Sequence, residues 1–216
     1  MIRVKICCIS SIAEAEMAVR HGASALGLVG HMPSGPGVIG DDLIAEIAAA
    51  APPAVATFLL TSETEPDAII DHVRKCGTST VQLVDAVNPG AYRALRRGLP
   101  NVKIVQVIHV TGPESVDEAM ACAPMVDALL LDSGQPKAAV KELGGTGRVH
   151  NWLLSRRIVT EVRRPVFLAG GLNPGNAAEA SQSVQPFGLD LCTGVRTDGH
   201  LDEAKLKAFF GALAVH

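Results

Sequence analysis

The sequence has few aromatic residues and no large excess of charge of one sign. Only 3% of its 216 residues are Phe, Trp or Tyr, and 19 Lys and Arg against 22 Asp and Glu give a net charge of −3 at pH 7. A protein that binds nucleic acid usually presents a basic surface to the phosphates, and aromatic rings on which unpaired bases stack. We therefore expect no nucleic-acid partner.

Long apolar runs are also missing from the sequence. No run approaches the roughly 20 residues that span a bilayer. The first ten residues, MIRVKICCIS, lack the apolar core and the small-residue cleavage site of a signal peptide. These absences predict a cytoplasmic protein with no membrane partner.

Cysteine is scarce and odd in number. The five cysteines are scattered along the chain at Cys7, Cys8, Cys76, Cys122 and Cys192. This distribution is typical of reduced thiols rather than of a disulfide framework. Cys7 and Cys8 are adjacent on an expected strand, where successive side chains point to opposite faces and do not readily chelate one metal ion. Because no C-x-x-C or H-E-x-x-H spacing occurs elsewhere, we expect no metal site.

Aliphatic residues are abundant and are arranged in short runs. Hydrophobic residues make up 48% of the chain and charged residues 19%, a composition typical of a globular protein with a large core. Eight β-rich or apolar runs recur along the whole sequence, as strands do. They occupy residues 2–6, 25–29, 54–60, 80–83, 102–110, 126–131, 165–169 and 189–192.

Segments with helical periodicity separate these runs. Ser11 with Glu14, and Ser115 with Glu118, have the spacing of a capping box, and Asn173 precedes a proline as a helix N-cap often does. Strands that alternate with helices pair in parallel through crossover connections. The pattern therefore indicates an α/β protein with a parallel sheet.

The number of units favours a closed barrel over an open sheet. Eight units in 216 residues average about 27 residues, which suits one strand, one helix and two short loops. An open doubly wound sheet usually has a G-x-G-x-x-G turn after its first strand, whereas this strand leads into Cys7 and Cys8. We predict that residues 1–216 form one domain, a single (β/α)8 TIM barrel.

Three glycine-rich turns follow the last three predicted strands, on the barrel face that carries active sites. Glycine lets backbone N–H groups approach an anion closely, and the start of a following helix adds partial positive charge. Each turn alone is also explained by ordinary turn chemistry, but together they match the usual phosphate position of this fold. The predicted phosphate-binding residues are Gly145, Gly147, Gly170, Gly171, Gly194 and Val195.

Two reactive side chains end predicted strands on the same face. Cys7 ends the first strand, and Asp132 ends the sixth after the apolar residues 128–131. A carboxylate that emerges from a buried strand needs solvent or a partner. Their positions alone are also consistent with structural roles. Asp132 could accept a hydrogen bond in a loop or cap a helix, and Cys7 could be a small buried side chain. Lys5 should share the strand face of Cys7, where an ion pair near the site is one interpretation.

Several motifs together point to one family. They are VKIC at 4–7, GASALG at 22–27, VQL at 81–83, LLDS at 130–133, GGTG at 144–147, Trp152, AGGLNPGN at 169–176 and TGV at 193–195. In this order, and across nearly the whole chain, they resemble the phosphoribosylanthranilate isomerases. The resemblance implies a barrel that rearranges an aminoaldose phosphate to an aminoketose phosphate in tryptophan biosynthesis, without cofactor or metal. It also implies that Cys7 is the general base and Asp132 the general acid.

Other positions depart from that family's pattern. The family usually has Ser-Pro-Arg where this chain has SGP at 34–36, and Gln-Leu-His-Gly where it has QLVD at 82–85. The arginine of the first motif is expected to contact the anthranilate carboxylate. His31 and Arg196 lie near the family's ligand-contacting loops and are candidates to supply positive charge instead, although each residue type is common in solvated loops. The predicted substrate contacts are Lys5, Gln82, His31 and Arg196.

Three functions remain open from the sequence. The first is the family's own isomerisation, the second is isomerisation of a different phosphorylated sugar, and the third is non-catalytic binding of a phosphorylated metabolite. Each predicts a small phosphosugar as the partner. The sequence leaves open whether the protein is a monomer or a homodimer.

Overall fold

The computed structural model describes residues 2–134 and 150–214. Eight parallel strands form a closed barrel in chain order, in which β8 pairs with β1. The strands are β1 (Arg3–Ile6), β2 (Ala25–Val29), β3 (Ala56–Thr61), β4 (Thr80–Leu83), β5 (Lys103–His109), β6 (Ala128–Asp132), β7 (Val166–Leu168) and β8 (Gly188–Leu191). Each predicted run overlaps one of these strands, with ends that differ by two residues at most. The predicted (β/α)8 barrel is confirmed.

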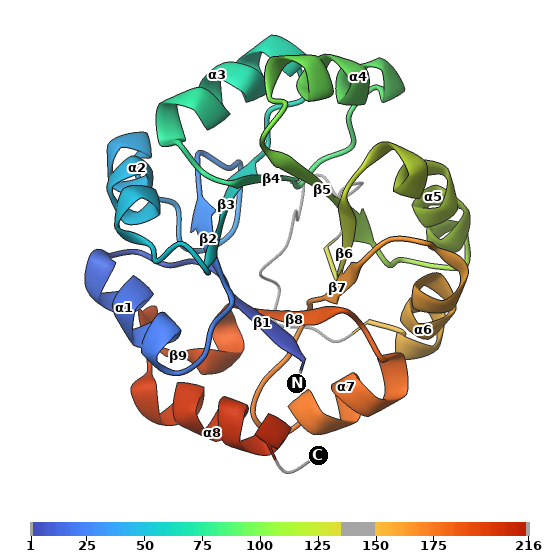
Figure 1. Ribbon diagram of the computed structural model, residues 1–216. Helices are drawn as coiled ribbons and strands as arrows, with labels where there is room; N and C mark the ends of the chain where they lie inside the picture. The colour runs from blue at the N-terminus through green and yellow to red at the C-terminus, as the bar shows by residue number, and fades with distance from the viewer. Residues whose placement is uncertain (1, 135–149, 215–216) are drawn as a thin grey trace.

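Helices surround the barrel as an outer ring (Figure 1). They are α1 (Ile12–Arg20), α2 (Asp41–Ala50), α3 (Pro66–Cys76), α4 (Pro89–Gly98), α5 (Glu114–Cys122), α6 (Trp152–Glu161), α7 (Ala177–Val184) and α8 (Glu203–Ala214). A short antiparallel pair, β9 (Arg196–Thr197) and β10 (His200–Leu201), precedes α8. Within the described ranges, no helix has both the length and the apolar character needed to cross a bilayer.

Alternation along the strands divides the buried side chains between two cores. Leu129 and Leu131 on β6 pack in the larger core between the barrel and the helices. Leu130, between them, belongs to a second core inside the barrel, because successive side chains of a strand point to opposite faces. Phe58 and Phe167 meet edge to face within this inner core, with ring centroids 5.9 Å apart. The barrel interior is therefore filled with side chains, and space for a ligand remains at its mouth.

Only one of the three predicted helix starts has the expected form. The Ser11 hydroxyl accepts from the N–H of Glu14, as in a capping box, and the Glu14 carboxylate accepts from the N–H of Ser10, one residue before the N-cap. The prediction for Ser115 is wrong, because α5 begins at Glu114 and the Ser115 hydroxyl instead accepts from the N–H of Thr111. The prediction for Asn173 is also wrong, since α7 begins at Ala177; the Asn173 side chain closes the preceding turn by accepting from the N–H of Gly175.

Candidate active site

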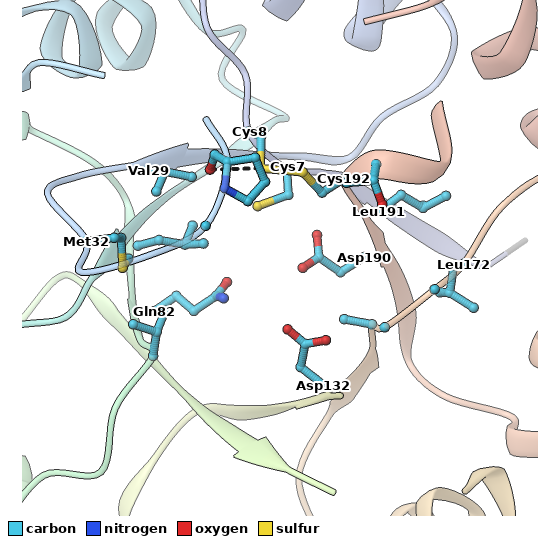
Figure 2. A pocket seen from close by; sticks show the side chains of 18 of the residues that line it. Cys7, Cys8, Val29, Met32, Gln82, Asp132, Leu172, Asp190, Leu191 and Cys192 are labelled. Atoms are coloured by element: carbon cyan, nitrogen blue, oxygen red, sulfur yellow. Dashed lines mark hydrogen bonds between the residues drawn. A yellow bond between two sulfur atoms is a disulfide. The ribbon is translucent and has the colours of Figure 1, made fainter. Parts of the chain in front are cut away.

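A cavity opens at the carboxyl ends of the strands, where sequence analysis placed the site. Figure 2 shows side chains from several strands with their polar ends turned toward this space. The lining residues used below are Cys7, Cys8, Gln82, Asp132, Gly170, Gly171, Asp190, Cys192 and Thr193. Cys7 and Asp132, which are 125 positions apart in the sequence, therefore share one cavity.

Cys7 lies immediately beyond β1, with its N–H donating to the Leu191 carbonyl at 2.7 Å. This bond continues the hydrogen-bond ladder between β1 and β8 and holds the Cys7 backbone in place. The thiol is buried, and burial raises its pKa to about 11. The ammonium of Lys5 opposes this rise, because a nearby positive charge favours the thiolate. The environment of Cys7 therefore holds the free site mainly in the thiol form, with a cation placed to stabilise the thiolate.

Lys5 forms an ion pair with Asp190, a residue that sequence analysis missed. The two are Cα partners on β1 and β8, and Lys5 Nζ lies 2.8 Å from Asp190 Oδ1. Lys5 is fully buried and Asp190 lines the cavity. Burial raises the pKa of Asp190, and Lys5 opposes that rise. The sequence contains one signal for this residue, a single acid between Leu189 and Leu191. Because a buried charge is rare without a partner, such an acid in an apolar strand predicts a paired or functional side chain.

Asp132 ends β6 with a carboxyl group that is buried at the cavity. Its Oδ1 accepts from the N–H of Ser133 at 2.7 Å. Burial raises the pKa of Asp132, and the negative charge of Asp190 adds to the effect, whereas the Ser133 N–H, His109 and Lys5 oppose it. A carboxyl group in these surroundings keeps its proton to higher pH than an exposed one. Asp132 therefore has the character of an acid that can give up a proton.

The turns after β7 and β8 pack against each other beside the cavity. Gly170 and Gly171 both have left-handed backbone conformations, with φ of +83° and +66°, which favour glycine. At Gly194 an added Cβ would collide with the Leu172 carbonyl oxygen, so only glycine fits between the turns. Val195, in the 3-10 turn Thr193–Val195, is buried. Gly145 and Gly147 lie outside the described residues, so the predicted phosphate site is described only in part.

Of the four predicted substrate contacts, only Gln82 lines the cavity. Gln82 on β4 points into the cavity, and its Oε1 has no hydrogen-bond partner among the described residues. Lys5 lies deeper, paired with Asp190. His31 is exposed and does not line the cavity. Arg196 is buried behind β1, where its guanidinium pairs with Glu14 instead of reaching the cavity.

The structure corrects the prediction that all five cysteines are reduced. Cys8 and Cys192 form a disulfide at the cavity rim, with Cα atoms 5.9 Å apart (Figure 2). Such pairing needs Cα atoms within about 7 Å, a condition met here because closure of the barrel brings the ends of β1 and β8 together. Cys7, Cys76 and Cys122 are free and buried.

One group of metal-ligand side chains lies away from the cavity, within the described part of the chain. Ligand atoms of Asp41, His72 and Cys76 are all within 4.8 Å of one another. The Asp41 carboxylate already accepts from Lys75 Nζ at 3.1 Å, and it lies 3.2 Å from His72 Nε2. These contacts account for the cluster without an ion, and the predicted absence of a metal site stays a prediction.

The fold and the site together define a class, a (β/α)8-barrel enzyme with an acid and a thiol at the carboxyl ends of its strands. The family profile described as N-(5'phosphoribosyl)anthranilate (PRA) isomerase matches residues 4–212, and the chain belongs to that family.

Curated relatives and solved structures agree with the family match. The chain is 37% identical over 210 residues to N-(5'-phosphoribosyl)anthranilate isomerase 2 of Methanosarcina mazei, covering 96% of this chain and 92% of that protein. It is similar to the phosphoribosyl anthranilate isomerase structure from Thermus thermophilus, with 27% identity, TM-score 0.83 and 99% of both chains covered.

A third relative was solved with a ligand. That phosphoribosyl anthranilate isomerase is in complex with reduced 1-(o-carboxyphenylamino)-1-deoxyribulose 5-phosphate. It is 25% identical to this chain, with TM-score 0.80 and full coverage of both chains.

Proposed function

We propose that this protein isomerises N-(5'-phosphoribosyl)anthranilate to the corresponding aminoketose phosphate in tryptophan biosynthesis. The observation that carries the proposal is that Cys7 and Asp132 line one cavity in a chain that matches the isomerase family over residues 4–212. Family membership supports the reaction, and the geometry supports the roles of the two residues. The substrate is a small phosphosugar, and neither cofactor nor metal takes part.

Asp132 acts first in the proposed reaction, as the general acid. Burial raises the pKa of its carboxyl group, so the group holds its proton to higher pH than an exposed carboxyl does. In the proposed step this proton passes to the furanose ring oxygen. The bond between that oxygen and C1′ breaks, its electron pair stays on the oxygen, and the nitrogen lone pair forms the C1′ iminium. Positioned proton transfer of this kind contributes roughly 10²- to 10⁴-fold to a rate.

Cys7 acts second, as the general base. Its thiolate removes the proton from C2′, and the electron pair of that C–H bond forms the C1′–C2′ double bond as the iminium nitrogen becomes neutral. The resulting enolamine becomes the ketone when the 2′-hydroxyl loses its proton and C1′ gains one. Burial raises the pKa of the Cys7 thiol, so the Lys5 ammonium that favours the thiolate has a direct part in this step.

The turns after β7 and β8 hold the phosphate in this proposal. Gly170 and Gly171 line the cavity, and the packing of Gly194 against Leu172 keeps the turn that continues to Val195 beside them. Gly145 and Gly147 belong to the same proposed cradle from outside the described residues. Fixing the phosphate end keeps the reacting carbons near the acid and the base, which lowers the entropic part of the barrier. Gln82 contacts the substrate through its unpartnered Oε1.

The quaternary state and location are part of the proposal. We expect one domain over residues 1–216 that acts in the cytoplasm as a monomer or a homodimer. Light scattering of the purified protein distinguishes the two assemblies, and fractionation of the host cell tests the location.

Complementation tests the reaction. A host that lacks the isomerase should grow without tryptophan when it expresses this chain, and should not grow when it expresses Asp132→Asn at the same level. In the purified system, N-(5'-phosphoribosyl)anthranilate should be consumed at a rate proportional to enzyme. Sound expression without growth or turnover would show that the substrate is a different phosphosugar or that the protein only binds one.

A further inference from the structure

The backbone that carries Cys7 changes direction directly after that residue, before the N–H of Ile9 donates to the Gly27 carbonyl on β2. The Cys7 N–H makes a ladder bond to Leu191, and the chain then turns at Cys8, which has a left-handed φ of +62°. The carbonyls of Cys7 and Cys8 turn to Arg196 instead of to a neighbouring strand. Arg196 Nη2 lies 3.3 Å from the Cys7 oxygen and also donates to the Cys8 oxygen.

Arg196 is itself held in one orientation by Glu14. Its two terminal nitrogens donate to the two carboxylate oxygens of Glu14, each at 3.0 Å. Nη1 also donates to the Gly199 carbonyl at 2.8 Å. Glu14 accepts in addition from the N–H groups of Ser10 and Leu201. Both partners of the pair are buried, and the guanidinium is a rigid planar donor that a network of this kind fixes in place.

The position of Arg196 in the chain connects two parts of the site. It directly follows the turn Thr193–Val195, which we propose as part of the phosphate cradle, and its side chain reaches the strand end that carries Cys7. A buried ion pair is often no more stabilising than apolar side chains of the same size, so stability alone is a poor explanation for this network. Fixed geometry at the Cys7 backbone explains it directly.

We propose that Arg196 is a positioning residue, which holds the Cys7 and Cys8 carbonyls so that the Cys7 thiol faces the substrate carbon. The inference rests on the proposed role of Cys7 as the base. It assigns Arg196 no contact with the substrate. Loss of its hydrogen bonds should therefore lower turnover while leaving substrate binding nearly intact.

The test uses a double variant, because removing Arg196 alone would leave Glu14 as a buried unpaired charge. Arg196→Met with Glu14→Gln removes both charges and should preserve the fold, which thermal unfolding checks. A displacement of about 1 Å at a reacting group can lower a rate about 10²-fold. We expect kcat to fall by about 10- to 100-fold, with KM and the affinity for reduced 1-(o-carboxyphenylamino)-1-deoxyribulose 5-phosphate nearly unchanged.

Two further variants separate positioning from general destabilisation. Arg196→Lys keeps the charge, but one ammonium cannot reproduce the planar fork, so its kcat should lie between those of the wild type and the double variant. Arg96→Met is the matched control, because Arg96 pairs with Asp127 just before β6, at the opposite end of the barrel. Its kcat should equal that of the wild type even if its thermal stability falls.

Alkylation of Cys7 by iodoacetamide gives a readout that does not depend on turnover. In the double variant Cys7 should react several-fold faster than in the wild type, while the buried Cys76 and Cys122 react as before. Unchanged kcat and Cys7 reactivity in the double variant would overturn the inference, as would an equal fall of kcat in Arg96→Met. An inactive wild type would contradict the proposed function. The alkylation rate of Cys7 would then be the remaining test of whether Arg196 positions that residue.

Discussion

Lys5 and Asp190 form a buried ion pair next to Cys7, with Lys5 Nζ 2.8 Å from Asp190 Oδ1. The pair places opposite charges beside one thiol. Burial has the largest effect on the pKa of Cys7 and raises it. Lys5 opposes this rise, and Asp190 adds to it. The two residues should therefore tune the base in opposite directions.

Replacing Lys5 should lower the fraction of Cys7 that is present as the thiolate. In Lys5→Met the pKa of Cys7 rises further, because the opposing positive charge is gone. The reactive form, with Asp132 protonated and Cys7 ionised, becomes less populated. We expect kcat to fall through the neutral range and the high-pH limb, which follows the pKa of Cys7 at about 11, to move to higher pH. The profile is measured with one substrate from pH 5 to the highest pH at which the protein stays folded.

Asp190→Asn is the paired test of the same relationship. Removing the negative charge should lower the pKa of Cys7 and move the high-pH limb downward. Parallel shifts of both variants in one direction would contradict electrostatic tuning by the pair. The variants must first be shown to remain folded, because each leaves one buried charge without its partner.

Removal of either proposed proton-transfer group should lower turnover strongly. Cys7→Ala and Asp132→Asn should each reduce kcat by at least ~10²-fold, the usual scale for general acid or base catalysis. Binding of ribose 5-phosphate, measured by calorimetry, should change much less. Cys122→Ala removes a buried thiol that does not line the cavity and should retain wild-type kcat. Near wild-type turnover in either variant would show that its residue has another role.

The phosphate cradle predicts a common loss of affinity for phosphorylated ligands. Gly171 has φ of +66°, a conformation that valine strongly disfavours. Gly171→Val should weaken the binding of ribose 5-phosphate and of inorganic phosphate in parallel. Ribose should bind weakly to both the wild type and the variant. Gly211→Val is the control, because an added Cβ there meets no atom within 4 Å. Equal wild-type affinity for ribose and ribose 5-phosphate would remove the proposed site.

The disulfide predicts that stability depends on the redox state. Cys8 and Cys192 are 184 residues apart, and a cross-link that closes so long a loop stabilises the fold by up to about 5 kcal/mol in the chain-entropy model. Dithiothreitol, a dithiol that becomes oxidised as it reduces the bond to two thiols, should lower the urea midpoint. Cys8→Ser with Cys192→Ser should have that lower midpoint with or without the reductant. A wild-type midpoint insensitive to dithiothreitol would contradict the stabilising role.

The sequence by itself determined the barrel and the ends of its strands. Short apolar runs and helical segments are local patterns, since they follow from periods of about 2 and 3.6 residues. The sequence therefore predicts all eight strands, and it predicts that Cys7 and Asp132 lie at the mouth of the barrel, where the structure has them. The helix starts at Ser115 and Asn173 were misplaced because the side chains of Ser, Asn and Asp also close turns that precede a helix.

The tertiary structure alone decided which side chains became partners. Lys5 and Asp190 are 185 residues apart, and Cys8 and Cys192 are 184 apart; both pairs exist because β8 closes on β1. Arg196 was expected near the substrate from its place after the last turn, but its side chain pairs with Glu14, 182 residues away. No local period encodes such distances. They follow from strand register and barrel closure, which the packing of the whole chain fixes.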